Sequence, residues 1–146
     1  MPLFAKRGDR STRFTVEYGE SGFRLIRRSD RPKGAPIGDV LDRAPSPDRV
    51  WVEARDSSGR LVYRTTLRDP VRQTVEVFGP DGLITRVPRS RPSGVFTFVV
   101  PDDRQIAAIV VLAGPAASIA PGGAGGPGTT RELIRIAPNQ QPQESR

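Results

Sequence analysis

Residues able to do acid–base or nucleophilic chemistry are few in this chain. None of its 146 residues is histidine or cysteine, so the commonest general base and the strongest nucleophile are missing. Disulfides and the familiar zinc sites are excluded for the same reason. A Ser–Lys pair would have to use Lys6 or Lys33, which lie in segments expected to be arms or loops. No carboxylate pair has a spacing that predicts a shared site. We therefore predict a protein that is not an enzyme and holds no metal and no cofactor.

Two motifs have both a functional and a structural interpretation. Asp102 and Asp103 are neighbours in Pro101–Arg104, and adjacent side chains diverge in a turn, so we interpret them as turn residues and not as metal ligands. Gly122–Thr130, with the sequence GGAGGPGTT, is similar in composition to a phosphate-binding loop. It lacks the lysine and the strand placed directly before such a loop. We interpret it as part of a linker.

Basic charge is the main signal for a partner. The net charge is +7, and Lys6 and Lys33 are the only lysines. An excess of arginine is typical of contact with phosphates or nucleic acid. GC-rich coding bias also raises Arg, Ala, Gly and Pro together, and we favour it because the arginines are spread along the chain. The alternative function, a basic nucleic-acid-binding accessory protein, would use two groups of loop residues: Arg27, Arg28, Arg31 and Lys33, and Arg86, Arg89 and Arg91.

The central element is a hairpin over Val50–Leu67. Two alternating apolar runs flank Asp56–Gly59, whose Asp and Gly suit a type I turn. Pairing Arg55 with Arg60 predicts one apolar face, formed by Val50, Val52, Ala54, Leu61, Tyr63 and Thr65. On the opposite face, Trp51 meets Arg64, and we predict a cation–π contact on the solvent side. The alternative is that Trp51 is buried under the loop Ser29–Arg49.

Similar alternation predicts the other strands. Arg13–Tyr18 and Phe23–Arg28 form an N-terminal hairpin, and Gln73–Phe78 and Leu83–Val87 flank a turn at Gly79–Gly82. Prolines over Ser29–Arg49 predict a long loop. We predict an all-β fold, a single antiparallel β-sandwich of about eight short strands with long Pro/Gly-rich loops and a flexible C-terminal arm.

Three segments carry a resemblance to a known group of domains. Val50–Arg64 is a valine-rich strand, a D-x-x-G turn and an L-x-Y-R strand; Gly94–Pro101 reads G-x-F-T-F-x-V-P; and Ile106–Leu112 is valine-rich again. The chain resembles the immunoglobulin-like and fibronectin-type accessory domains of bacterial proteins over about a third of its length. The resemblance implies a sandwich that binds, spaces or docks, and it transfers no functional residue.

A second hairpin, over Val95–Leu112, is predicted to be apolar on both faces. Pairing Val100 with Gln105 puts Phe96, Phe98, Ala107, Ile109 and Val111 on one face. The other face then holds Val95, Thr97, Val99, Ile106, Ala108 and Val110. Because a sandwich strand normally shows water a polar face, we expect the long loop, the C-terminal segment or another chain to cover it.

The C-terminal region predicts a docking arm. Residues 114–130 form a Gly/Pro-rich linker. Its part Gly114–Gly128 spans roughly 20–23 Å as a flexible coil. Residues 131–137 supply apolar contacts through Leu133, Ile134 and Ile136, and their backbone could extend a sheet edge of a neighbouring subunit. The alternative is that they form the last strand of their own sandwich. We expect 1–12 to be a flexible arm, 13–113 the sandwich and 138–146 a disordered tail.

These expectations describe a non-enzymatic structural or protein–protein interaction module of a larger bacterial or bacteriophage assembly, docking through sheet edges and the arm. Its partner would be another protein or a second copy of the chain. The first residues contain no secretory signal, and the apolar stretch Ile106–Leu112 is too short for a membrane span, so we expect a cytoplasmic or virion- or assembly-associated location. The predicted interaction residues are Trp51, Arg64, Val95, Val99, Ile106, Val110, Leu133, Ile134 and Ile136.

Overall fold

The computed structural model describes residues 9–71, 74–88, 93–117 and 129–143, and over 74–77 and 86–88 it describes only the backbone. These residues form strands and turns and no helix. In chain order the strands are β1 (Ser11–Gly19), β2 (Gly22–Arg31), β3 (Val50–Arg55), β4 (Leu61–Leu67), β5 (Thr74–Phe78), β6 (Ile84–Pro88), β7 (Gly94–Pro101), β8 (Ala108–Ala113) and β9 (Arg131–Ile136).

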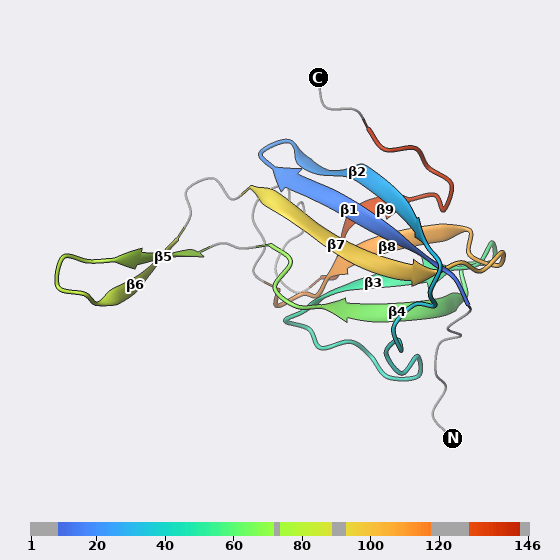
Figure 1. The fold of residues 1–146 in the computed structure, drawn as a ribbon. Helices are drawn as coiled ribbons and strands as arrows, with labels where there is room; N and C mark the ends of the chain where they lie inside the picture. Colours follow the sequence, from blue (N-terminus) through green and yellow to red (C-terminus); the bar gives the residue numbers. More distant parts are fainter. Residues whose placement is uncertain (1–8, 72–73, 89–92, 118–128, 144–146) are drawn as a thin grey trace.

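Two antiparallel sheets face each other (Figure 1). One has three strands in the order β2-β1-β7, and the other has four in the order β4-β3-β8-β9. The predicted all-β antiparallel sandwich is therefore confirmed. Strands β5 and β6 pair with each other in a separate two-stranded ribbon, which stands away from both sheets at the left of Figure 1.

The core lies between the two sheets and follows from alternation along each strand. Phe14, Val16 and Tyr18 of β1 are buried on one face, as the sequence pattern predicts. Phe98 of β7 stacks on Phe14 with ring centroids 5.5 Å apart. The opposing sheet contributes the inward residues Val52, Ala54, Tyr63, Ile109, Val111 and Ile136.

The central hairpin has the predicted faces but a different register. Ala54 pairs with Tyr63 and Glu53 with Arg64, so Trp51 lies opposite Thr66 and not opposite Arg64. A bulge after Ala54 and a longer connection cause the difference. Over Val50–Ala54 the shift from the predicted pairing is two residues, and a two-residue shift keeps these side chains on their predicted faces.

The connection of the central hairpin is closed by Asp56. Its N–H donates to the carbonyl of Arg60 at 3.0 Å, and its carboxylate accepts from the hydroxyl and the N–H of Ser58 and from the N–H of Arg60. The hydroxyl of Ser58 and then the Arg60 N–H hold the pKa of the Asp56 carboxyl below its ordinary value. Gly59 completes the turn with a φ of 85°, a conformation that suits glycine.

The predicted hairpin over Val95–Leu112 is wrong, because its two strands belong to different sheets. Strand β7 pairs with β1 and strand β8 with β3 and β9. The chain crosses between the sheets at Asp102–Ala107, where the N–H of Ile106 donates to the carbonyl of Asp103 at 3.1 Å. Two amphipathic strands can bury their apolar faces side by side or across a core, so alternation alone does not identify a strand's partner.

The C-terminal segment folds onto its own chain. Strand β9 pairs antiparallel with β8, which is the alternative to the expected docking arm. Ile136 is fully buried, and Leu133 and Ile134 pack against the core. Residues 138–143, expected to be disordered, continue toward the other sheet, where the N–H of Gln143 donates to the carbonyl of Leu25 at 2.9 Å. The expected arm 1–12 is described only from residue 9, and β1 already begins at Ser11.

Candidate interaction site

The tip of the β5–β6 hairpin is a closed turn. The N–H of Gly79 donates to the carbonyl of Leu83 at 2.9 Å, and the N–H of Gly82 donates to the carbonyl of Gly79 at 3.0 Å. The carboxylate of Asp81 accepts from the N–H of Leu83 at 3.2 Å. Gly82 has a φ of 78°, which a residue with a side chain adopts only with strain. The turn predicted at Gly79–Gly82 is confirmed, and it holds Phe78 opposite Ile84.

This tip presents apolar side chains to solvent. Among the described residues, large hydrophobic side chains are exposed at five positions, and three lie here: Phe78 at 72%, Leu83 at 65% and Ile84 at 57%. The other two, Ile37 and Val95, lie on the sandwich and its loops. The sequence predicted the turn but not the exposure of these residues, because alternation does not reveal that a hairpin lacks a sheet behind it.

Trp51 and Arg64 do not form the predicted surface contact. Each is about 5% exposed, so Trp51 is buried and does not lie on the solvent side. The indole N–H of Trp51 donates to Glu53 Oε2 at 3.3 Å, and Glu53 also pairs with Arg55. The guanidinium of Arg64 donates instead to the carbonyls of Val40 and Arg43. Trp51 is thus bonded within β3, whereas Arg64 joins β4 to the long loop.

The other predicted interaction residues differ in accessibility. Ile106 and Val110 are buried, and Leu133, Ile134 and Ile136 pack in or against the core. Val99 is half-buried, and Val95 is exposed at the start of β7. The outer-face residues of β7 are therefore the part of this set that a partner could reach.

The basic residues chosen for the nucleic-acid alternative do not form one group in the described structure. Arg28 donates Nε–H to the carbonyl of Pro138 at 3.0 Å, and Arg31 donates to the hydroxyl of Ser11 at 3.3 Å. Arg27 and Lys33 are exposed. Arg89 and Arg91 lie outside the described residues, and so does the side chain of Arg86.

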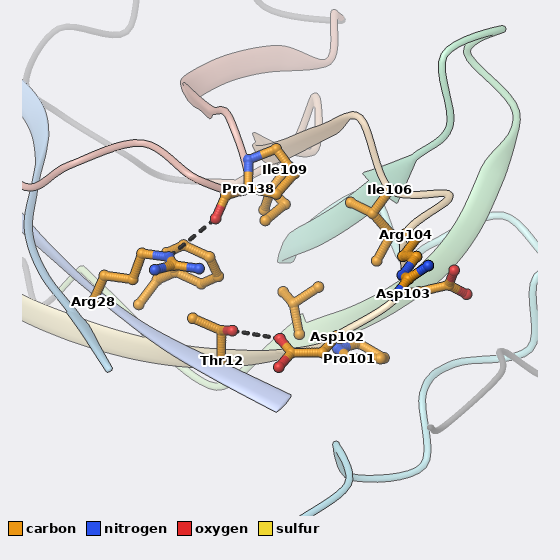
Figure 2. Close-up of a pocket in the computed structure, with 11 residues that line it drawn as sticks. Thr12, Arg28, Pro101, Asp102, Asp103, Arg104, Ile106, Ile109 and Pro138 are labelled. Atoms are coloured by element: carbon orange, nitrogen blue, oxygen red, sulfur yellow. Dashed lines mark hydrogen bonds between the residues drawn. The ribbon is translucent and has the colours of Figure 1, made fainter. Parts of the chain in front are cut away.

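A pocket of about 310 Å³ opens at the end of the sandwich beside Pro101–Ile106. Figure 2 shows the hydroxyl of Thr12 directed at Asp102 and the guanidinium of Arg28 at the carbonyl of Pro138. The apolar side chains at its base, Phe14, Val100 and Ile109, are each only 1% exposed. Asp102 and Arg104 at its rim are exposed. We interpret this pocket as the junction of β1, the crossing turn and the C-terminal segment.

The described residues contain no cluster of three or more carboxylates that could hold a metal ion. The interpretation of Asp103 as a turn residue is confirmed, because its Oδ1 accepts from the N–H of Gln105 at 2.9 Å. Nor do these residues include a helix that is long and apolar enough to cross a membrane. No family model, curated protein or solved structure matches the chain.

Proposed function

We propose that this protein is a non-enzymatic protein–protein interaction module of a larger assembly, and that it docks through the tip of the β5–β6 hairpin. The observation that carries this proposal is the set of three exposed apolar side chains, Phe78, Leu83 and Ile84, on a ribbon outside both sheets.

The physical argument begins with the stability of the ribbon. A two-stranded hairpin is marginally stable in water unless a third strand or another surface covers it. Strands β5 and β6 have no such cover within the described residues. Full burial of a large apolar side chain contributes about 1.5–3 kcal/mol. A partner with an apolar groove would therefore stabilise the hairpin and gain affinity from the same side chains.

The order of the four-stranded sheet supports the proposed relationship to immunoglobulin-like modules. In that fold, the third strand shares a sheet with the last two strands of the domain, in the order third, second-last, last, and the order β3-β8-β9 is the same once the β5–β6 ribbon is left out of the count. The three-stranded sheet departs from the pattern, because its central strand is β1. Such modules characteristically bind and space other proteins, which agrees with the proposed function.

The test replaces exposed apolar side chains at the tip of the hairpin and leaves the glycines and the aspartate of its turn unchanged. We expect the double substitution Phe78→Thr and Leu83→Thr to leave the circular dichroism spectrum and the melting temperature unchanged, because both side chains are exposed and threonine retains a high strand propensity. Proteins that co-purify with the tagged full chain, or larger assemblies of the chain itself, should be lost. Ile37→Thr is the matched control, since Ile37 is as exposed as Leu83, at 65%, but lies in the long loop.

Two results would contradict the proposal. If the double variant retained every partner and assembly of the unmodified chain, the tip would not be the docking element. If it unfolded while Ile37→Thr did not, the tip residues would be needed for folding and their exposure would have no functional meaning.

A further inference from the structure

Strand β7 is a sheet edge that no other described strand covers. The two sheets have four edge strands, β2, β7, β4 and β9. At β2 the carbonyl of Leu25 accepts from Gln143, and at β4 the carbonyl of Arg64 accepts from Asp39. Strand β9 carries Arg131, Glu132 and Arg135, charges of the kind that discourage edge pairing.

Among the residues that the structure describes, no comparable protection exists at β7. Its residues, Gly94–Pro101, include no charged side chain. Within the described structure β7 pairs with β1 alone, and its Pro101 carbonyl, at the end of the strand, accepts from the N–H of Asp103. Figure 1 shows β7 at the edge of the three-stranded sheet that lies opposite β2. Along an edge strand, alternate N–H and C=O groups point away from the neighbouring strand and can pair with another chain.

The sequence of β7 specifies which chain would fit. Val95-Phe96-Thr97-Phe98-Val99 reads the same in both directions. In an antiparallel pair of identical strands centred on Thr97, Thr97 lies opposite Thr97, Val95 opposite Val99, and Phe96 opposite Phe98. A two-fold interface needs this self-complementarity, because the same patch serves both subunits. We propose that two copies of the chain associate by antiparallel pairing of β7 with β7, about a two-fold axis at Thr97.

The side chains suit this pairing on both faces. On the outer face Val95 and Thr97 are exposed and Val99 is half-buried, and Val–Val and Thr–Thr are favourable cross-strand pairs. On the inner face Phe96 and Phe98 belong to the core. In the dimer, Phe96 of each copy would lie beside Phe98 of the other, so the two hydrophobic cores would be in contact. This surface is separate from the hairpin tip, and the inference does not depend on the proposed function.

Charged substitutions of Thr97, the residue at the two-fold axis, test the proposed pairing of β7 with β7. We expect the unmodified chain to have twice its monomer mass in sedimentation velocity. Thr97→Lys and Thr97→Glu should each give monomers, because like charges directly opposite each other destabilise a strand pair. An equal mixture of the two variants should regain the dimer, because each lysine then faces a glutamate. Thr15→Lys is the matched control: Thr15 lies opposite Thr97 on β1, one strand in from the edge, and its variant should remain dimeric.

Introduced cysteines test the register on a chain that has none of its own. Residues directly opposite in an antiparallel pair have Cα atoms about 4.5–5.5 Å apart, within the range of a disulfide. Thr97→Cys should therefore form a disulfide-linked dimer on mild oxidation. Val95→Cys should link efficiently to Val99→Cys but not to itself, and Thr15→Cys should remain unlinked.

The inference is overturned if the unmodified chain is a monomer at every concentration tested, if Thr97→Lys associates as strongly as the unmodified chain, or if mixing the two charge variants restores nothing. These results would leave the hairpin proposal intact, because the tip substitutions do not alter β7. Conversely, a dimer that survives Phe78→Thr with Leu83→Thr and is lost with Thr97→Lys supports the β7 interface alone.

Discussion

Arg64 shows how one buried charge can fix an irregular loop. Its guanidinium lies on the outer face of β4, where it donates to the carbonyls of Val40 and Arg43. Asp39 Oδ2 lies 3.7 Å from Nε, but Nε has no hydrogen-bond partner. Burying a charge is costly unless its hydrogen bonds are satisfied. The loop carbonyls therefore satisfy the buried guanidinium of Arg64, and the same hydrogen bonds fix the position of the loop.

At this scale we predict that Arg64→Met lowers the free energy of unfolding by about 1–3 kcal/mol, the range for losing hydrogen bonds to a charged group. The loop carbonyls lose their donor, so amide hydrogen exchange should also accelerate around Val40. Urea denaturation measures the first effect. Arg60→Met is the control, because Arg60 is exposed beside the same hairpin. A change as small as the control's would show that the loop is held by other contacts.

The junction between the long loop and the end of β8 depends on close backbone approach. The N–H of Gly114 donates to the carbonyl of Arg49 at 2.9 Å, and the N–H of Ala116 donates to the carbonyl of Pro47 at 2.8 Å. A Cβ on Gly114 would lie 2.2 Å from the Pro47 oxygen. That separation is far inside van der Waals contact, so this element tolerates only glycine.

We therefore expect Gly114→Ala to destabilise the protein by about 1–3 kcal/mol, the usual cost of forcing extra atoms into a packed site. Thermal unfolding followed by circular dichroism measures the loss. Gly19→Ala is the control, because no atom lies within 4 Å of a Cβ built there. Equal melting temperatures for the two variants would mean that the loop moves aside without cost.

As a whole, the molecule combines a stable sandwich with an appended ribbon. The buried core lies between the two sheets, whereas the β5–β6 ribbon exposes its apolar tip. Thr74 and Pro88 are paired at the base of the ribbon, so its two ends are close enough to be joined by a short linker.

Replacing residues 74–88 by a short Gly-Ser linker should change the unfolding free energy of the sandwich by less than about 1 kcal/mol, the range of changes away from a packed core. Partner binding through the tip should be lost completely. Chemical denaturation and size measurement on the same sample separate the two effects. A large loss of stability would show that the ribbon is part of the folding unit and not an appendage.

Local patterns were sufficient to predict much of the architecture. Alternation placed Phe14, Val16 and Tyr18 on the buried face of β1, and the Gly-Pro-Asp-Gly turn located the tip of the β5–β6 hairpin. The same reasoning misassigned the Val95–Leu112 region, because β7 and β8 bury their apolar faces across the core and not beside each other. It also paired Trp51 with Arg64, whereas the shifted register places Thr66 opposite Trp51.

The amino-acid sequence by itself determined the all-β class, the faces of the strands, the absence of histidine and cysteine chemistry, and the palindrome in β7. These are properties of residue type and of a period of two along each strand. Only the tertiary structure decided which strands pair, that β9 returns to its own sheet, and that β7 is left as an open edge. Strand pairing depends on contacts between residues distant in the chain, and a two-residue repeat is equally compatible with several partners.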